Sequence, residues 1–467
     1  MQFDVVAVGG GFSGLVTACR AAELGLSAAV VEARSEDRYP CSSRYATGVC
    51  NIMGLPILME PDRLFRAIMD GSDGSARPAV ARAIADNGKR AIDWLSQEGA
   101  RFVSRALQKD QPGQQVLAPP RRLTAGLDWE ERGSDVLMRR LEENLTRRRG
   151  VLMRNTKVEA LAVDGGACVG VDAVRDDKPL RIGAKAVVIA DGGFAASPEM
   201  VAKYITPRAD RVLYRVGPGA KGDGIRMAER AGAAIGGFGA FYGHIHHKNA
   251  MTNAQLWPYP HLDVLAEISI LVAPDGKRFT DEELGGVCMA NAIAHLADPL
   301  SAILILDDAV WRMEPTITTT VAANPTMVAA GGELTSAPDI ETLAARVGLP
   351  PSPLAQTIRE YVQAIESNDF ARLAVPRTIR KHKPMPIVTP PFHAIALCAG
   401  ITGTMGGVEI NEHAQALRPD GNVVPGLYAV GTPVAGLEGG PRAGYVGGLS
   451  KAFILGLLAA EHMASAR

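Results

Sequence analysis

A short apolar run followed at once by a glycine turn opens the chain. Residues 3–8 are almost continuously apolar, which is typical of a buried parallel strand, and residues 9–14 read GGGFSG. Apolar residues at helical spacing follow, and a second apolar run over residues 27–31 ends at Glu32. The order strand, glycine turn, helix, strand and acid predicts a βαβ unit that binds a dinucleotide.

The glycines of this turn have separate physical roles. Gly9 permits the tight turn, Gly11 lets the backbone approach a pyrophosphate, and Gly14 lets the helix pack closely against the strand. The helix start then presents unpaired N–H groups and a positive dipole end to the phosphates. Glu32 can accept hydrogen bonds from ribose hydroxyls, and its charge disfavours the 2′-phosphate of NADP. The motif alone does not distinguish FAD from NAD.

The hydrophobic pattern predicts further elements along the chain. Helices are expected over residues 63–69, 78–97, 136–149, 354–365 and from 449 to the end. Within residues 217–234, a second glycine turn at 222–224 is expected to be followed by another helix. Residues 151–174 alternate as a hairpin with its turn at 164–166, and residues 271–280 predict a strand, a turn and a strand. Buried strands are expected at 186–190, 303–306 and 408–410, and loops over 37–53 and 111–127.

Composition divides the chain into three segments. Four of the nine histidines, with several aromatic residues, fall between residues 241 and 261, and prolines gather between 384 and 391. The sequence then returns to glycine-rich stretches that resemble the first segment. We therefore expect an α/β protein in which residues 1–237 and 397–467 form a dinucleotide-binding domain and residues 238–396 form an inserted α+β domain.

Bulk composition narrows the class of protein. The chain has 467 residues, 47% of them apolar, and a net charge of −1, which gives no electrostatic case for binding nucleic acid or an anionic membrane. The longest apolar run, residues 452–460, is too short for a membrane span. Six scattered cysteines without CxxC spacing disfavour a metal site and suggest reduced thiols in a cytoplasmic protein. Because the first strand begins at residue 3, we expect no signal peptide.

Several ordered motifs give the chain a specific resemblance. They are GGGFSG with Glu32, CSSRYATG, VVIADGGF, KGDGIRMAERAGA, GKRFTDEE, TMGGVEIN and GLYAVG. On these motifs the sequence resembles, nearly end to end, the flavoprotein family that contains soluble fumarate reductase, the succinate dehydrogenase flavin subunit, 3-ketosteroid dehydrogenases and tricarballylate dehydrogenase. The resemblance implies a Rossmann-like FAD-binding domain of the GR2 type, non-covalently bound FAD, and a cap domain over the flavin.

The resemblance also implies which positions contact FAD. Ser42, Ser43 and Thr47 offer hydroxyls on a loop that can follow the phosphates and the ring. The start of the last helix would aim N–H groups and a dipole end at the N1–C2=O edge of the reduced flavin. The expected contact positions are Gly9, Gly11, Phe12, Ser13, Gly14, Glu32, Ala33, Arg34, Ser42, Ser43, Thr47, Gly48, Val158, Ala190, Asp191, Gly192, Asp223, Gly431, Thr432, Gly448, Leu449 and Ser450.

Three departures from the fumarate reductase pattern bear on the substrate. Gly403 stands where those enzymes have a histidine. Those enzymes also have a proton-donating arginine eight residues after the arginine of an Arg-Phe pair; that arginine is Arg278 here, and the residue eight positions later is Gly286. Thr432 replaces the glutamate that holds the ribityl chain. The fumarate catalytic set is therefore absent, although Arg442 lies at or next to the family's substrate-carboxylate arginine. A surface-loop role for Arg442 is the alternative.

A second group of residues resembles the ketosteroid dehydrogenase branch. In that branch a tyrosine hydroxyl and a backbone N–H polarise a ketone, while a cap tyrosine removes the α-proton. Tyr445 is the candidate for the polarising hydroxyl, together with a nearby glycine amide. Tyr242, His244 and His246 are the candidate bases, because histidine titrates near neutral pH without a large shift. A structural or solvated role for each histidine stays open.

The sequence thus predicts an FAD-dependent oxidoreductase acting on CH–CH groups. We expect α,β-dehydrogenation of a small ketone or carboxylic acid, with the hydride passing to flavin N5 and the α-proton to a cap base. The reverse ene-reductase reaction and a non-catalytic flavin-binding redox sensor or partner subunit are the alternatives. The expected partners are a small-molecule substrate and an electron acceptor, either a quinone, a flavoprotein or oxygen, and the oligomeric state stays open.

Overall fold

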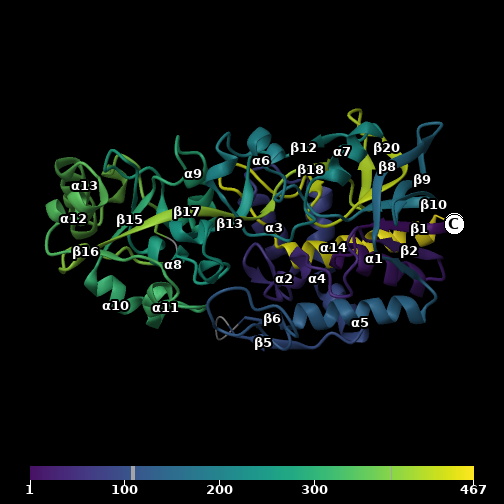
Figure 1. Cartoon of the computed structure of the whole chain (residues 1–467), viewed down its shortest axis with the longest axis horizontal. Helices are drawn as coiled ribbons and strands as arrows, with labels where there is room; N and C mark the ends of the chain where they lie inside the picture. Colours follow the sequence, from purple (N-terminus) through teal and green to yellow (C-terminus); the bar gives the residue numbers. More distant parts are fainter. Residues whose placement is uncertain (107–110, 380, 467) are drawn as a thin grey trace.

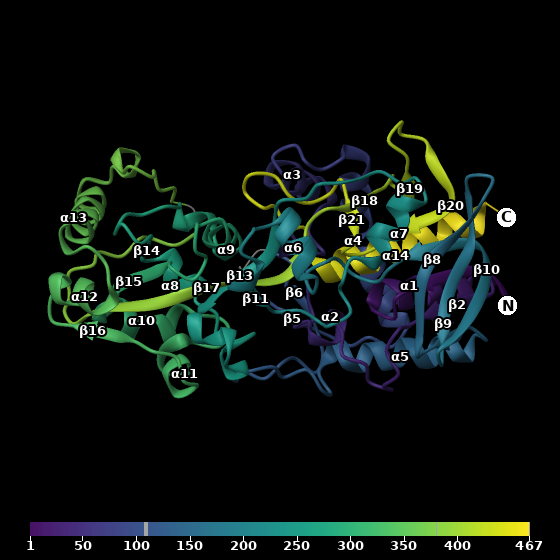
Figure 2. The same ribbon diagram turned by 45° about the horizontal axis from the view of Figure 1, so that its top comes forward.

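The computed structural model describes residues 1–106, 111–379 and 381–466 and shows an elongated molecule with two halves (Figure 1). Both termini and the main β-sheet lie in one half, and the green segment around α12 and α13 lies at the far end of the other (Figure 2). The long strand β17 (Phe392–Thr404) runs from one half towards the other.

The main sheet is the predicted dinucleotide-binding core. Five parallel strands follow the order β20–β10–β1–β2–β7, and β19, β8 and β9 add antiparallel pairs. β1 pairs on both sides, so its residues Val5–Val8 are buried, which explains the continuous apolar run. The strands are β1 (Gln2–Val8), β2 (Ala28–Val31), β7 (Val151–Met153), β8 (Thr156–Asp164), β9 (Ala167–Arg175), β10 (Lys178–Ile189), β19 (Gln415–Leu417) and β20 (Val423–Ala429).

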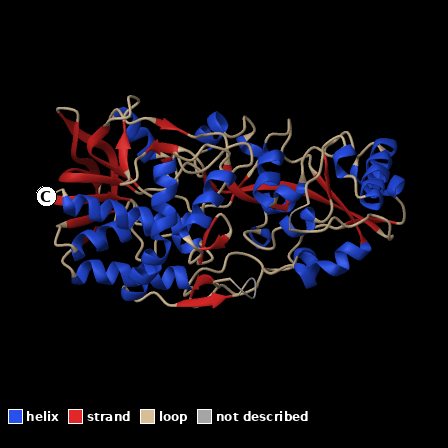
Figure 3. Ribbon diagram, turned by 180° about the vertical axis from the view of Figure 1, so that it is seen from behind, coloured by secondary structure: helices blue, strands red, loops and turns tan. Residues whose placement is uncertain are grey.

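Helices cover this sheet, as the view from behind shows (Figure 3). The helices α1 and α14 pack against each other, with the rings of Phe12 and Phe453 in edge contact at 5.0 Å between centroids. A Cβ on Gly14 would lie 2.0 Å from the Gly9 carbonyl oxygen, so only glycine allows this close approach of helix to strand. The helices are α1 (Phe12–Glu23), α3 (Pro61–Gly71), α4 (Pro78–Gln97), α5 (Gly133–Arg147), α6 (Pro198–Tyr204), α7 (Asp223–Arg230) and α14 (Gly448–Ser465).

The second half is built on β17. This strand pairs in turn with β11 (Leu213–Tyr214), β13 (Phe241–His247), β15 (Ile303–Asp307) and β16 (Thr335–Ala337), and β14 (Ile270–Val272) pairs with β15. Around it lie α8 (Asp263–Glu267), α9 (Gly286–Ala294), α10 (Asp308–Ile317), α11 (Ala323–Ala329), α12 (Ile340–Val347) and α13 (Pro351–Ser367). The predicted boundary between residues 396 and 397 falls inside β17, and the division into domains stays a prediction.

Two segments predicted as loops contain regular structure. Residues 37–53 hold α2 (Ser42–Tyr45) and β3 (Val49–Ile52), and residues 111–127 hold β6 (Gln114–Leu117), which pairs with β3 and β5 (Phe102–Arg105). These strands lack a continuous apolar run because only part of each is buried. Of the strand–turn–strand predicted at 271–280, β14 forms, and the return arm makes only a bridge from Arg278 to Val272.

The other predicted helices and strands are confirmed, and so is the hairpin, which β8 and β9 form. The remaining strands are short. β4 (Leu55–Pro56) pairs with β3, and β12 (Ile235–Gly236), β18 (Gly407–Glu409) and β21 (Val434–Ala435) form a separate small sheet. None of the six cysteines, all of which lie in the described ranges, forms a disulfide. Within the described ranges, no helix combines the length and the apolar character needed to cross a membrane.

Candidate active site

A cavity of about 490 Å³ opens between the two halves at the carboxyl ends of the main parallel strands. The glycine turn, Glu32, the loop around α2, residues 190–193 and the first turn of α14 line it on one side. Tyr242, His244, residues 257–259 and residues 402–404 line it on the other. Ligands of open α/β sheets bind at this edge, so the cavity is the candidate active site.

Backbone N–H groups and Glu32 organise the first part of the cavity. One carboxylate oxygen of Glu32 accepts the Gly10 N–H at 2.9 Å, and the other accepts the Arg34 N–H at 2.9 Å. The Ser43 hydroxyl accepts the Phe12 N–H at 2.9 Å, which joins the loop of α2 to the start of α1. The acid, the glycine turn and the hydroxyl loop therefore form one continuous surface.

Asp191 adds an acceptor to this surface. One of its carboxylate oxygens accepts the Gly224 N–H at 2.7 Å, while the other is buried without a hydrogen-bond partner. Burial raises the pKa of Asp191 to about 7. A buried acceptor that lines the cavity fits the hydroxyl groups of a dinucleotide.

Most of the predicted FAD positions line this cavity. The exceptions are Phe12, Gly14, Gly48, Gly431 and Ser450. Phe12 packs on Phe453 behind the wall, and the Ser450 hydroxyl donates to the Asn51 carbonyl at 2.7 Å. Gly431 has a φ of +80°, and a Cβ there would meet the Ser13 hydroxyl at 2.1 Å. These residues shape the cavity wall without facing its interior.

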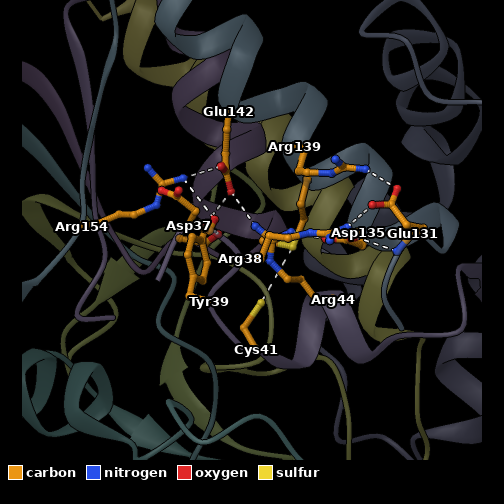
Figure 4. A network of polar contacts seen from close by, with 12 residues as sticks. Asp37, Arg38, Tyr39, Cys41, Arg44, Glu131, Asp135, Arg139, Glu142 and Arg154 are labelled. Carbon is orange, nitrogen blue, oxygen red and sulfur yellow. Dashed lines mark hydrogen bonds and ion pairs between the residues drawn. The ribbon is translucent and has the colours of Figure 1, made fainter. Parts of the chain in front are cut away.

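A network of ion pairs, buried around Arg44, joins the loop of α2 to α5 (Figure 4). The Arg44 guanidinium is fully buried and pairs with Asp135, and also with Glu142 at 2.9 Å. Arg38 reaches Asp135 at 2.6 Å and Arg154 reaches Glu142 at 2.7 Å, so both carboxylates have two arginine partners. Burial raises the pKa of Glu142. The network fixes the loop to α5.

Two tyrosines face each other at the other side of the cavity. The rings of Tyr242 and Tyr445 stack with centroids 3.7 Å apart and planes 11° apart. The Tyr445 hydroxyl accepts the Gly448 N–H at 2.5 Å, so the glycine amide predicted near Tyr445 is bonded to that hydroxyl. Burial raises the pKa of Tyr242 to about 12 and that of Tyr445 well above its ordinary value. Both hydroxyls are therefore protonated at neutral pH and can donate hydrogen bonds.

His244 connects Tyr242 to a buried carboxylate. Its Nδ1 lies 2.6 Å from Asp263 Oδ2, and its Nε2 lies 2.9 Å from the Tyr242 hydroxyl. Asp263, at the start of α8, also accepts the Ile245 N–H at 2.9 Å. Burial opposes ionisation of Asp263, but His261 and His244 outweigh it, and the pKa of Asp263 lies below its ordinary value. An ionised Asp263 holds the proton of His244 on Nδ1 and leaves Nε2 to accept from Tyr242.

His261 completes this group. Its ring stacks on that of His244 with centroids 4.6 Å apart and planes 21° apart, and its Nδ1 lies 3.6 Å from Asp263 Oδ2. Burial lowers the pKa of His261 to about 3, against the opposing effect of Asp263. The three residues lie close enough to suggest a metal site. However, an ion lies in the plane of each imidazole that binds it, and two stacked rings share no such position, so the geometry favours a hydrogen-bonded relay.

Comparisons with known proteins identify the family and its cofactor. The profile of the FAD binding domain family matches residues 4–444. The chain belongs to this family. Its cofactor is FAD, which the cradle of Glu32, Ser43 and Asp191 fits, and the predicted family and fold class are confirmed.

The relatives of this chain include reductases. It is 27% identical over 456 residues to the NADH:fumarate oxidoreductase of Klebsiella pneumoniae, covering 95% of this chain but 46% of that protein. It is 27% identical over 474 residues to a fumarate reductase (cytochrome) of Shewanella frigidimarina, covering 99% of this chain and 77% of that protein. This chain thus spans less than half the length of the Klebsiella relative.

A solved dehydrogenase has the same fold. The structure of 3-ketosteroid Δ1-dehydrogenase from Sterolibacterium denitrificans, in complex with 1,4-androstadiene-3,17-dione, matches with a TM-score of 0.76 at 20% identity. The match covers all of both chains, 100% in each case. At 20% identity, this similarity establishes a shared fold and nothing about the substrate.

Two predicted catalytic residues do not reach the cavity. His246 lies beyond the cavity wall on β13, is 0% exposed, and burial lowers its pKa well below the ordinary value. The Arg442 side chain pairs with Asp73, with Nε 2.9 Å from Oδ2, on a partly exposed turn outside the cavity lining. Its turn is fixed against α3, because a Cβ on Gly440 would lie 2.4 Å from the Ser72 carbonyl oxygen. The surface-loop alternative describes Arg442 better than substrate binding does.

Sequence reasoning missed several residues of the site. Arg215, Tyr259 and His261 line the cavity, and Asp263 completes the relay. Lys451 and Glu438 form a buried ion pair beside the start of α14 and also line the cavity. For Arg215, one sequence signal was available. This charged residue directly follows the short pair Leu213 and Tyr214 and stands shortly before the glycine turn at residues 222–224.

Proposed function

We propose that this chain catalyses α,β-dehydrogenation of a small ketone or carboxylic acid. The observation that carries the proposal is the relay Tyr242–His244–Asp263, which faces Tyr445 in the cavity that holds the FAD cradle. FAD, when bound, accepts a hydride from a substrate carbon. The residues of this chain must then activate the neighbouring C–H bond and take its proton.

Tyr445 is suited to activate the substrate. Its hydroxyl is buried and protonated, and it can donate a hydrogen bond to the substrate carbonyl or carboxyl oxygen while it accepts the Gly448 N–H. Drawing electron density towards that oxygen acidifies the hydrogen on the α-carbon. The position of the hydroxyl is fixed by the ring stacking on Tyr242.

Tyr242 and His244 are suited to remove the α-proton. The Tyr242 hydroxyl passes its proton to Nε2 of His244, and the Tyr242 oxygen takes the proton from the α-carbon. This coupling is needed because the raised pKa keeps the Tyr242 hydroxyl protonated at neutral pH, so its oxygen can accept a proton only as its own proton moves to His244. Asp263 lies against Nδ1 and stabilises the imidazolium that forms, as the buried aspartate of a catalytic triad does.

The reverse reaction, reduction of an activated C=C bond, is the second candidate. The names of the Klebsiella and Shewanella relatives favour it. The same residues serve in the opposite sense, since His244 and Tyr242 then deliver the proton to the α-carbon. We propose a quinone, a flavoprotein or oxygen as the electron partner of the dehydrogenase, and a reduced carrier for the reductase.

Product analysis tests the proposal. The FAD-loaded protein is incubated with saturated ketones and carboxylic acids and an artificial electron acceptor, and separately with enones and enoic acids and a reduced dye. Mass spectrometry is expected to find one product that has lost two hydrogens, or, for the reductase, gained two. A chain that converts none of these compounds in either direction, while its flavin is reduced by dithionite, would be a flavin-binding protein without turnover of its own.

A further inference from the structure

Arg215 occupies a buried position in the substrate side of the cavity. It follows β11, its N–H donates to the Ile401 carbonyl at 2.8 Å, and 8% of the residue is exposed. Nη1 donates to the Thr402 hydroxyl at 2.8 Å and Nη2 to the Pro258 carbonyl at 3.3 Å. Both contacts are neutral, and Nε is buried without a partner.

The lack of a carboxylate sets Arg215 apart from the other deeply buried arginines. Arg44 pairs with Asp135 and Glu142, and Arg278 and Arg377 both pair with Glu282. Among the residues with described positions, no carboxylate lies within 4.0 Å of the Arg215 guanidinium. A buried cation without a counter-ion is costly unless a ligand supplies the negative charge.

A second guanidinium strengthens the positive charge at this place. Arg121 lies over the ring of Tyr259 at 4.7 Å from the centroid, and Arg215 approaches the same ring at 5.8 Å. Arg121 donates to the Gly126 carbonyl, but its Nε and Nη1 are buried without partners. Burial lowers the pKa of Arg121 to about 10, and the charge of Arg215 acts in the same direction. Two cations this close repel each other, and an anion between or beside them relieves that repulsion.

The cavity leaves room for such an anion. Thr402 and Gly403 both line the cavity, and a Cβ built on Gly403 would approach only the methyl group of Thr432, at 3.9 Å, so the cavity is open at Gly403. Tyr242, His244 and Tyr445 line the same cavity. A molecule held by Arg215 would therefore lie in the cavity that the relay residues Tyr242 and His244 also line.

We propose that Arg215, supported by the charge of Arg121, binds a carboxylate of the substrate. This inference rests on the proposed function and narrows its substrate to a carboxylic acid, in place of a neutral ketone. A guanidinium offers planar N–H groups that match the two oxygens of a carboxylate, and the unpartnered Nε–H gives one of these donors. The role that the sequence suggested for Arg442 is thereby assigned to Arg215.

Binding measurements on the FAD-loaded protein test the assignment. The probes are acetate, malonate, succinate, glutarate and 4-oxopentanoate, each compared with its neutral methyl ester. Isothermal titration calorimetry and the flavin difference spectrum report binding. At least one carboxylate is expected to bind, its ester about thirtyfold more weakly or worse, and Arg215→Gln to weaken the carboxylate by a similar factor. Arg215→Lys keeps the charge and should recover part of the loss, and Arg121→Gln should show a smaller loss in the same direction.

Matched arginines supply the controls. Arg211, four residues before Arg215, pairs with Asp298, and Arg122, next to Arg121, pairs with Asp128. Arg211→Gln and Arg122→Gln should bind the probes as the wild type does. FAD content is measured for each variant, because loss of FAD from both Arg215→Gln and Arg215→Lys would mean that Arg215 holds the cofactor, which overturns the proposal.

The remaining outcomes separate this inference from the proposed function. If no carboxylate binds, if the esters bind equally well, or if Arg215→Gln binds as the wild type does, the carboxylate site is wrong, even when ketones are still converted. If carboxylates bind through Arg215 but nothing is turned over, the site stands and the proposed reaction is wrong.

Discussion

The two sides of the cavity differ in whether a buried charge has a partner of opposite charge within the chain. On the cofactor side, Arg44 is paired with Asp135 and Glu142, and Glu32 accepts two backbone N–H groups. On the substrate side, the two hydrogen bonds of the Arg215 guanidinium go to neutral oxygens, of Thr402 and Pro258, and His261 has a buried Nδ1 without a hydrogen bond. The charge of Arg44 is compensated within the chain, whereas the charge of Arg215 would be compensated by a bound ligand.

This difference separates residues that build the site from residues that act in it. Paired charges hold the loop of α2 and the glycine turn in one geometry before any ligand arrives. Unpaired polar groups in a cavity cost stability, and they are retained where binding or catalysis uses them. The variants below should therefore affect stability on one side and turnover on the other.

The largest effect is expected from breaking the paired side. Arg44→Leu removes the fully buried partner of both Asp135 and Glu142, and breaking a buried ion pair by removing one partner costs about 3–5 kcal/mol. Chemical denaturation should show this loss, and the protein should be purified without FAD. As a control, Arg140→Ala breaks a half-exposed pair with Glu143 and should cost no more than about 0.5 kcal/mol. Equal stabilities of Arg44→Leu and Arg140→Ala would show that the network does not hold the loop.

Asp191, a carboxyl group on the cofactor side with one buried oxygen that lacks a hydrogen-bond partner, should give a pH-dependent effect. Its pKa is raised from 3.8 to about 7, so between these values the folded apoprotein binds a proton that the unfolded chain has released. Stability of the apoprotein should therefore fall as pH rises through this window, by up to about 1.4 kcal/mol per pH unit. Asp191→Asn should remove this slope in denaturation curves, while Asp164→Asn, at the exposed end of β8, should keep it. A slope unchanged in Asp191→Asn would contradict the assignment.

On the substrate side, Asp263→Asn should reduce turnover more than stability. The asparagine keeps the shape but cannot stabilise a positively charged His244, so kcat should fall about a hundredfold or more. FAD content and the melting temperature should stay close to those of the wild type. Steady-state kinetics on the identified substrate gives the comparison, and a wild-type kcat would remove the relay from the mechanism.

The smallest effect is expected from Glu32→Gln. The amide keeps one acceptor but loses the charge that binds the Gly10 N–H and the ribose hydroxyls, so FAD should bind about tenfold more weakly. Equilibrium dialysis of apoprotein with FAD measures this, with Glu36→Gln as the exposed control. A loss of turnover at saturating FAD would mean that Glu32 also acts on the substrate side.

Local patterns explain which features the sequence predicts. The βαβ unit depends on residues within one short stretch, because the glycine turn, the apolar strands and Glu32 specify it together. β6 was missed because its stability comes from pairing with β3 and β5, which its own half-polar sequence does not reveal. The FAD cradle is predictable for the same reason as the βαβ unit.

The substrate side is less predictable because distant segments assemble it. Asp263 lies nineteen positions after His244 and meets it only because α8 begins beside β13. Arg215 faces the cavity because β11 pairs with β17, nearly two hundred residues later in the chain. His246 was a reasonable candidate by residue type, but the cavity ends before it on β13. Residue type and spacing identify such candidates, and only the fold selects among them.

The most direct test compares the flavin spectra of wild type and Tyr242→Phe under anaerobic conditions. Both FAD-loaded proteins are titrated with saturated carboxylic acids and keto acids, and, after reduction, with their unsaturated counterparts. We predict that one compound bleaches or reoxidises the wild-type flavin, and that Tyr242→Phe binds the same compound but reacts at least about a hundredfold more slowly. A flavin that responds to dithionite but to no compound in either direction, or a Tyr242→Phe variant that reacts at the wild-type rate, would contradict the account.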